Sequence, residues 1–260
     1  MVIDTHCHLY DERFNEDCDF IIKNAKNSNL EAIIVVGSDL ENSKKVINLA
    51  NKYENVYAII GTHPEGCEKF SEEDVNFYLE NSKNKKVVAI GEIGLDYYYT
   101  TDNKEKQKEI LVKQLEVANK VNLPVCMHLR DAYGDFLEVI ETHKHLINNG
   151  GVIHCFSGSL EYAKVMVSYG FKLGFDGPLT FKNNKKAVEV VKELPLEHFV
   201  VETDAPYLAP EPFRGTRNEP KYVNYVARKI AEIKNMNIEE VEKVLLENTY
   251  KLFPKLERKS

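Results

Sequence analysis

The sequence lacks long hydrophobic runs, a signal segment and an even set of cysteines. No stretch of eighteen apolar residues occurs, which excludes a membrane-spanning helix. The first residues contain no basic segment followed by an apolar one, so we expect no secretory signal. Of the five cysteines, Cys7 and Cys155 stand beside histidines and Cys126 lies in an apolar run. This pattern predicts free thiols in a reducing cytoplasm and not a disulfide framework.

Positive charge is also scarce. Lys and Arg number 34 against 41 Asp and Glu, which gives a formal charge of −7. That balance excludes a protein that coats nucleic acid through a broad basic face, but it permits a phosphate or strand end to be captured locally by metal ions. No linker rich in Pro, Gly or Ser divides the chain, so we expect residues 1–260 to form a single domain. We also expect a monomer, with no membrane contact and no obligate protein partner.

The regular alternation of apolar and amphipathic segments predicts the fold. Short apolar runs are each followed by a longer segment with helical spacing, the pattern of parallel βα units. Eight such units in 260 residues predict a closed (β/α)₈ TIM barrel. An open doubly wound sheet is the structural alternative, but no glycine-rich phosphate motif follows the first strand. The predicted strands are Val2–Ile3, Ala32–Val36, Val56–Ile60, Val87–Ile90, Val125–Met127, Gly151–Ile153, Phe171–Gly174 and Phe199–Val201.

Histidines and carboxylates follow these predicted strands, at the barrel end where TIM-barrel active sites lie. His6 and His8 are two residues apart, so in extended backbone they point to the same side. Nitrogen and oxygen ligands suit Zn²⁺, Mn²⁺ or Mg²⁺, and six are too many for one tetrahedral catalytic ion. We therefore predict two divalent ions bridged by a carboxylate. His6, His8 and Asp204 are assigned to one ion and His128 and His154 to the other, with Glu92 as the bridge.

Two further side chains at the same end are candidates for substrate contacts. His63 follows the third predicted strand, where it is interpreted as a general acid, a phosphate donor or a structural cap. Arg130 lies two residues after His128 and is suited to grip a phosphate through two parallel hydrogen bonds. The alternative for Arg130 is an ion pair with Asp131 or Asp96.

The last predicted strand leads into two more candidate groups. Glu202 is interpreted either as the hydrogen-bond partner of a ligating histidine or as an ordinary inward-facing barrel residue. The proline-rich segment 206–220 has no helical or strand period, and long loops of this kind often carry function. It contains Arg214 and Arg217, and we expect Arg214 to help bind substrate.

Four segments of the sequence carry a family resemblance: Asp4–Leu9, Gly91–Tyr98, His154–Gly158 and Glu202–Leu208. Together they resemble the TatD family of metal-dependent deoxyribonucleases, and the resemblance extends over the whole chain. The resemblance implies a TIM-barrel metallohydrolase of the amidohydrolase superfamily, with the six ligands named above in the metal positions. It also implies a nuclease that depends on a divalent ion and acts on DNA, commonly as a 3′–5′ exonuclease, with His63 and Arg130 placed to meet phosphate.

We therefore expect a deoxyribonuclease that hydrolyses phosphodiester bonds of single-stranded DNA with metal-activated water. In this scheme Asp204 orients the water and accepts its proton, while Glu92 and His63 complete the catalytic group. The main alternative is a hydrolase of a small amide, lactone or phosphoester on the same barrel, because the fold alone does not select the substrate. A barrel that binds metal or nucleic acid without turnover is the second alternative.

Overall fold

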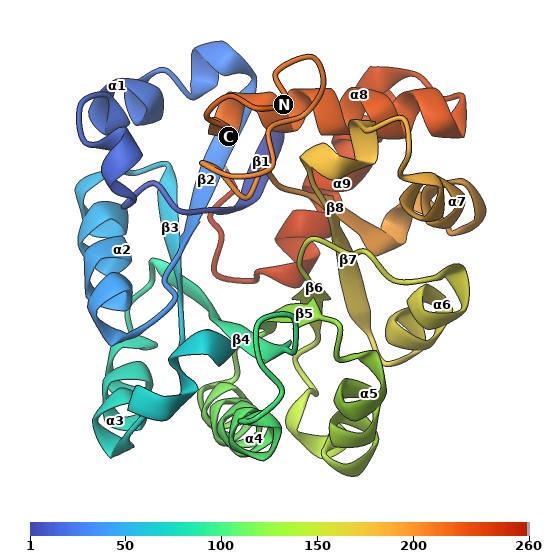
Figure 1. The fold of residues 1–260 in the computed structure, drawn as a ribbon. Helices are drawn as coiled ribbons and strands as arrows, with labels where there is room; N and C mark the ends of the chain where they lie inside the picture. The colour runs from blue at the N-terminus through green and yellow to red at the C-terminus, as the bar shows by residue number, and fades with distance from the viewer. Residues whose placement is uncertain (259–260) are drawn as a thin grey trace.

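The computed structural model describes residues 1–258 and contains one eight-stranded parallel sheet in the order β1 to β8. A backbone bridge between Cys7 and Ala205 joins β1 to the segment after β8 and closes the ring. This arrangement confirms the predicted (β/α)₈ barrel (Figure 1). The strands are β1 (Val2–Cys7), β2 (Leu30–Val36), β3 (Val56–Ile60), β4 (Val87–Asp96), β5 (Val125–Arg130), β6 (Gly151–Ile153), β7 (Phe171–Phe175) and β8 (Phe199–Val201).

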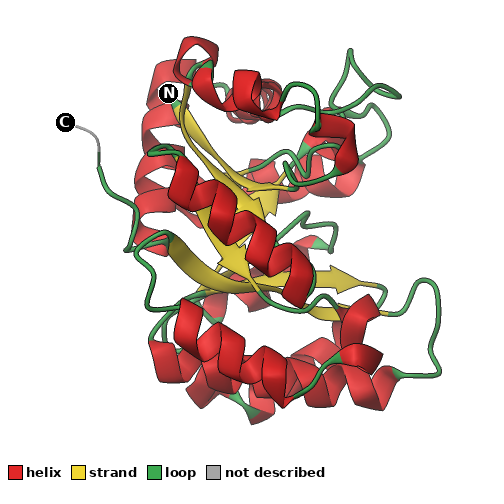
Figure 2. Cartoon of the chain, turned by 90° about the vertical axis from the view of Figure 1, so that its left-hand side faces the viewer, coloured by secondary structure: helices red, strands yellow, loops and turns green. Residues whose placement is uncertain are grey.

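Helices surround the strands and long loops project beyond the strand arrowheads, away from the two termini (Figure 2). Within residues 1–258 no helix has the length and apolarity needed to cross a membrane. The helices are α1 (Cys18–Lys23), α2 (Leu40–Lys52), α3 (Glu72–Asn81), α4 (Lys104–Val121), α5 (Tyr133–Thr142), α6 (Leu160–Ser168), α7 (Lys185–Glu193), α8 (Val223–Lys234) and α9 (Ile238–Leu252).

The strands are buried on both faces, which explains why their sequences are continuous apolar runs. In β2, Ile33 and Val35 pack in the cluster that also contains residues of the surrounding helices. Ile34 and Val36 belong to a second cluster, made of strand residues together with the chain end around Phe253. Alternate residues therefore face the helices and the barrel interior, so neither face selects polar side chains.

Strand β4 is longer than predicted and carries part of the candidate site within it. It continues to Asp96 because its second half pairs with β5, placing Gly94 opposite His128 and Asp96 opposite Arg130. The polar residues and glycines in this half end the apolar pattern, although every residue of the strand is buried. Gly94 has a φ of +150°, and a Cβ there would overlap the carbonyl oxygen of His128. This position consequently needs glycine.

Candidate metal centre

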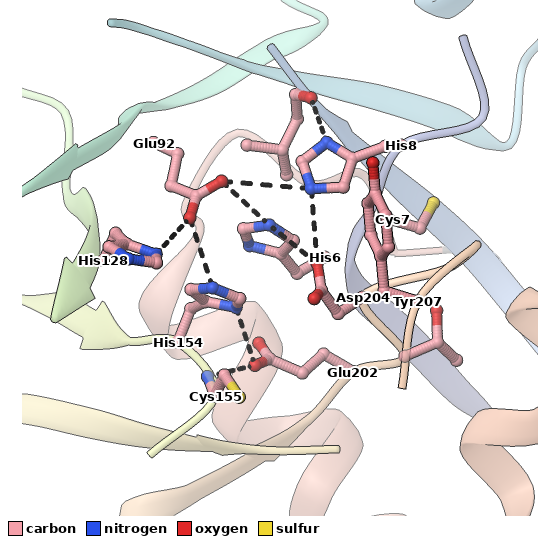
Figure 3. A network of polar contacts seen from close by, with 12 residues as sticks. His6, Cys7, His8, Glu92, His128, His154, Cys155, Glu202, Asp204 and Tyr207 are labelled. Carbon is pink, nitrogen blue, oxygen red and sulfur yellow. Dashed lines mark hydrogen bonds and ion pairs between the residues drawn. The ribbon is translucent and has the colours of Figure 1, made fainter. Parts of the chain in front are cut away.

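The six predicted ligands converge at the carboxyl ends of the strands, around the carboxylate of Glu92 (Figure 3). One oxygen of this carboxylate, Oε2, lies 3.4 Å from His6 Nε2 and 3.9 Å from His8 Nε2. Asp204 Oδ1 completes this half of the centre, at 3.8 Å from His6 Nε2 and 3.2 Å from His8 Nε2. Two histidines and two carboxylates thus face one point.

The other oxygen of Glu92 faces a different pair of histidines. Oε1 lies 2.8 Å from His128 Nδ1 and 3.2 Å from His154 Nε2. The two halves share the carboxylate of Glu92, the residue assigned as the bridge, and the ring of His6 stacks on that of His154 with centroids 3.9 Å apart. The structure brings all six side chains together around Glu92, and the assignment of each to one of two ions stays a prediction.

The buried nitrogen of His6 tests whether this group suits a cation. The His6 side chain is fully buried, and its Nε2 has no hydrogen-bond partner within residues 1–258. Its other nitrogen, Nδ1, lies 3.4 Å from Cys126 Sγ. A buried polar atom without a partner is destabilising by about 1–3 kcal/mol, and a divalent ion that accepts this lone pair would remove that deficit. The donor set of imidazole nitrogens and carboxylate oxygens fits Zn²⁺, Mn²⁺ or a related ion.

The carboxylates of the centre are held in the ionised form that metal binding needs. Burial opposes ionisation of Glu92, but the surrounding histidines, His154 foremost, hold the pKa of this carboxyl well below its usual value. Burial acts on Asp204 in the same way, and the hydrogen bond from His8 lowers its pKa below the ordinary value. In turn, burial disfavours the charged form of His154, yet Glu92 and Glu202 raise its pKa well above normal.

Glu202 contacts the ring nitrogen of His154 that faces away from Glu92. Its Oε1 lies 3.1 Å from His154 Nδ1 and also accepts a hydrogen bond from the backbone N–H of Cys155. The side chain is fully buried, and Gly174 leaves the space that it occupies. The first of the two interpretations of Glu202 is therefore correct: it orients a histidine of the centre and leaves Nε2 free toward Glu92.

Replacing Glu202 by Gln is expected to weaken binding of a divalent ion by about 10- to 100-fold, because an amide holds the His154 ring without a charge. Calorimetric titration of the metal-free protein with Mn²⁺ measures this change. The same substitution at the exposed Glu197 is the control. Affinities within twofold of each other for wild type and Glu202→Gln would contradict this assignment.

Two acidic residues that support the centre were not assigned this role from the sequence. Asp96 Oδ2 lies 2.9 Å from His128 Nε2 and so fixes the ring that presents Nδ1 to Glu92. Asp4 is fully buried and accepts hydrogen bonds from the backbone N–H and the hydroxyl of Thr203, which ties β1 to the turn that carries Asp204. The sequence signal that could have identified Asp4 was its position directly after an apolar run and two residues before His6.

His63 lies at the rim of the centre, where its two ring nitrogens face different groups. Its Nδ1 accepts a hydrogen bond from the backbone N–H of Glu65, so it caps the short helical segment Pro64–Lys69. Burial and the neighbouring His128 lower its pKa to about 3, so the ring is neutral and carries its proton on Nε2. That nitrogen lies 3.7 Å from Glu92 Oε1, too far for a hydrogen bond to that oxygen, and the ring is too weakly basic to carry a second proton at neutral pH.

A hollow of about 500 Å³ opens above the centre, and we call it the metal hollow. It is lined by centre residues together with Tyr10, Asp11, Ser38, Asn42, His63, Glu65, Asp96, Tyr99, Arg130 and Tyr207. Arg130 lies over the ring of Tyr98 at 3.6 Å from its centroid. The expected alternative, an ion pair of Arg130 with Asp131 or Asp96, does not occur in the described structure.

The structure places both arginines of the proline-rich loop outside the metal hollow, so the substrate contact expected of Arg214 stays a prediction. Arg214 lies outside the metal hollow, with its guanidinium 4.3 Å from the centroid of the Phe181 ring. Arg217 donates two hydrogen bonds to the carboxylate of Asp17, at 2.9 and 2.6 Å, and also forms an ion pair with Glu219. The loop path was not readable from its composition, because Asp17 lies 200 residues away in the sequence.

Comparison with known proteins agrees with this geometry. Residues 3–254 match the family model described as TatD related DNase. The Bacillus subtilis (strain 168) protein YabD, an uncharacterized metal-dependent hydrolase, is 44% identical over 97% of this chain and 99% of its own. The crystal structure of the TatD homologue YjjV from Escherichia coli K12 has a TM-score of 0.90 at 34% identity, covering 97% of this chain and 98% of that one.

Fold, ligand set and relatives together define a metal-dependent hydrolase built on a TIM barrel. The chain belongs to the TatD family. A more distant solved structure, a mutant organophosphorus hydrolase, has a TM-score of 0.65 at 9% identity over 97% of this chain and 92% of its own, and shares the fold only.

Proposed function

We propose that this protein is a deoxyribonuclease that depends on two divalent ions and releases nucleotides from the 3′ end of single-stranded DNA. The observation that carries the proposal is the position of Glu92, whose two oxygens face two separate pairs of histidines. Two neighbouring ions can hold the attacking and the departing oxygen of a phosphodiester. The family description, TatD related DNase, supports the same substrate class.

In this proposal the protein side chains and the bound ions have separate roles in phosphodiester hydrolysis. Bound divalent ions would supply Lewis acidity at the phosphate and lower the pKa of a coordinated water. Asp204, kept ionised beside His8, is placed to orient the water and to accept its proton. The N–H of His63 and the guanidinium of Arg130 line the same hollow and are placed to donate hydrogen bonds to phosphate oxygens, which stabilises the charge that develops there.

The experiment compares substrates and metals on the purified protein treated with chelator. Single-stranded oligonucleotides labelled at the 5′ or the 3′ end, a small ester and a small amide are each incubated with Mg²⁺, Mn²⁺ or EDTA. We expect nucleotide release in the presence of a divalent ion, a ladder that shortens from the 3′ end, and no release in EDTA. Turnover of the ester or amide without DNA cleavage would overturn the proposal in favour of a small-substrate hydrolase.

A further inference from the structure

The wall of the metal hollow next to His128 carries two unusually exposed aromatic side chains. Tyr98 and Tyr99 follow β4 and are 57% and 70% exposed. Their rings pack edge to face, with centroids 4.8 Å apart. The backbone N–H of Tyr98 bonds to Asp96, the residue that also holds His128, so this aromatic pair is tied directly to the metal centre.

Arg130 combines with these rings and keeps its donors free. Its guanidinium carbon lies 3.6 Å from the Tyr98 centroid and 5.4 Å from the Tyr99 centroid. Within residues 1–258 its side chain forms no hydrogen bond or ion pair, and no other Lys or Arg lines the metal hollow. Stacking on Tyr98 limits the motion of the guanidinium but leaves the N–H groups in its plane available for a phosphate.

The other walls do not offer the same combination. Beyond His63 lies a second hollow, of about 550 Å³, which shares Ser38, His63 and Glu65 with the metal hollow. Lys69 and Phe70 line it, but so do six carboxylates, whose negative charge outweighs that of the one lysine and disfavours a phosphate chain. Near His8, Arg13 stacks on Tyr207, but its charge is paired through two hydrogen bonds with Asp11. The carboxylates of the second hollow are Asp39, Glu41, Glu65, Glu68, Glu73 and Asp74.

We propose that Tyr99 and Arg130 form the binding subsite for the nucleotide next to the scissile bond. The base stacks on the ring of Tyr99, which lines the hollow, and Arg130 binds that nucleotide's phosphate while Tyr98 positions the guanidinium. This inference rests on the proposed nuclease function and adds to it. A base can stack on a protein ring only when it is unstacked from its neighbours, so the subsite selects single-stranded ends without reading sequence.

Binding is tested without relying on cleavage. Phosphorothioate oligonucleotides, which resist hydrolysis, carry the fluorescent base 2-aminopurine at one of the three terminal positions and are titrated in Mn²⁺. The protein contains no tryptophan, so the fluorescence of this base can be excited selectively. We expect quenching at one position in the wild type. Tyr99→Ala should remove the quenching and raise Kd by about 5- to 100-fold, whereas Tyr99→Phe should retain both.

Phe20→Ala serves as the matched control, because Phe20 is 68% exposed and lies outside the metal hollow. Tyr98→Ala should raise KM more than it lowers kcat, and Tyr98→Phe should restore KM, as expected for a residue that positions Arg130. Quenching that is unchanged in Tyr99→Ala, or a Kd within twofold of wild type, would overturn the subsite.

Cleavage gives the second readout through an abasic substrate. Removing the base at the quenched position should lower kcat/KM of the wild type by the same factor as Tyr99→Ala, and the two changes together should cost no more than one of them. If the two changes together lowered kcat/KM by the product of their separate factors, the inference would be overturned. Failure of the nuclease proposal gives a different result: Tyr99-dependent quenching with no cleavage of DNA in any divalent ion. Cleavage that is indifferent to Tyr99 would refute the subsite alone.

Discussion

Glu92→Gln is expected to lower kcat/KM of the divalent-dependent reaction at least about a thousandfold. The substitution keeps the shape of the side chain but removes the charge that both halves of the centre share. Each half then loses an anionic ligand, and His154 loses one of the two carboxylates that raise its pKa. Initial rates on end-labelled DNA in Mn²⁺ measure the effect.

The control for this variant is Glu197→Gln, the same change on an exposed side chain away from the centre. Wild-type rates are expected for it. Circular dichroism on both variants checks that the barrel is retained. A Glu92→Gln enzyme with more than a tenth of wild-type activity would contradict the bridging role.

Removing the metal is expected to produce the largest change in stability. An ion that binds only the folded protein, at a hundred times its Kd, adds about 2.7 kcal/mol to the free energy of unfolding. A chain of this size gains about 2–4 °C in Tm for each kcal/mol, so one ion raises Tm by roughly 5–11 °C and two raise it further. Thermal unfolding of the chelator-treated protein with increasing Mn²⁺ measures the shift. A Tm independent of Mn²⁺ would refute specific binding to the folded state.

The size of this shift should depend on pH with a defined sign. Burial lowers the pKa of His154, but Glu92 and Glu202 outweigh it and raise the folded-state value well above 6.5. In the metal-free protein the protonated ring therefore adds stability below about pH 6.5, and this contribution is lost as pH rises through the folded-state pKa. Metal binding needs the unprotonated ring. The difference in Tm between metal-bound and metal-free protein should therefore widen as pH rises from 6 to 8.

The fold was predictable because parallel strands buried on both faces leave a clear mark in the sequence. Runs such as Ala32–Val36 and Val56–Ile60 locate their strands to within two residues. Locating strands from apolar runs fails where a strand contains residues of the candidate site. In β4 the residues from Gly91 to Asp96 end the apolar run, although backbone pairing with β5 continues through them.

The convergence of the candidate ligands was predictable, whereas most of the contacts that support them were not. His6 and His8 stand out because of their spacing and their position at the end of a strand. Asp96 became visible as the partner of His128 only when β4 and β5 were paired. The position of Arg214 outside the metal hollow was not predictable, because the distance from a loop residue to the site depends on the loop path. Such contacts depend on tertiary geometry, which composition and local spacing do not encode.

The most direct test of the two-ion centre is an anomalous difference map from crystals soaked in Mn²⁺, measured at the manganese absorption edge. We predict two peaks on opposite sides of the Glu92 carboxylate. One peak should contact the Nε2 atoms of His6 and His8, and the other should contact His128 Nδ1 and His154 Nε2. A single peak, or peaks that leave His6 Nε2 without a ligand contact, would contradict the account.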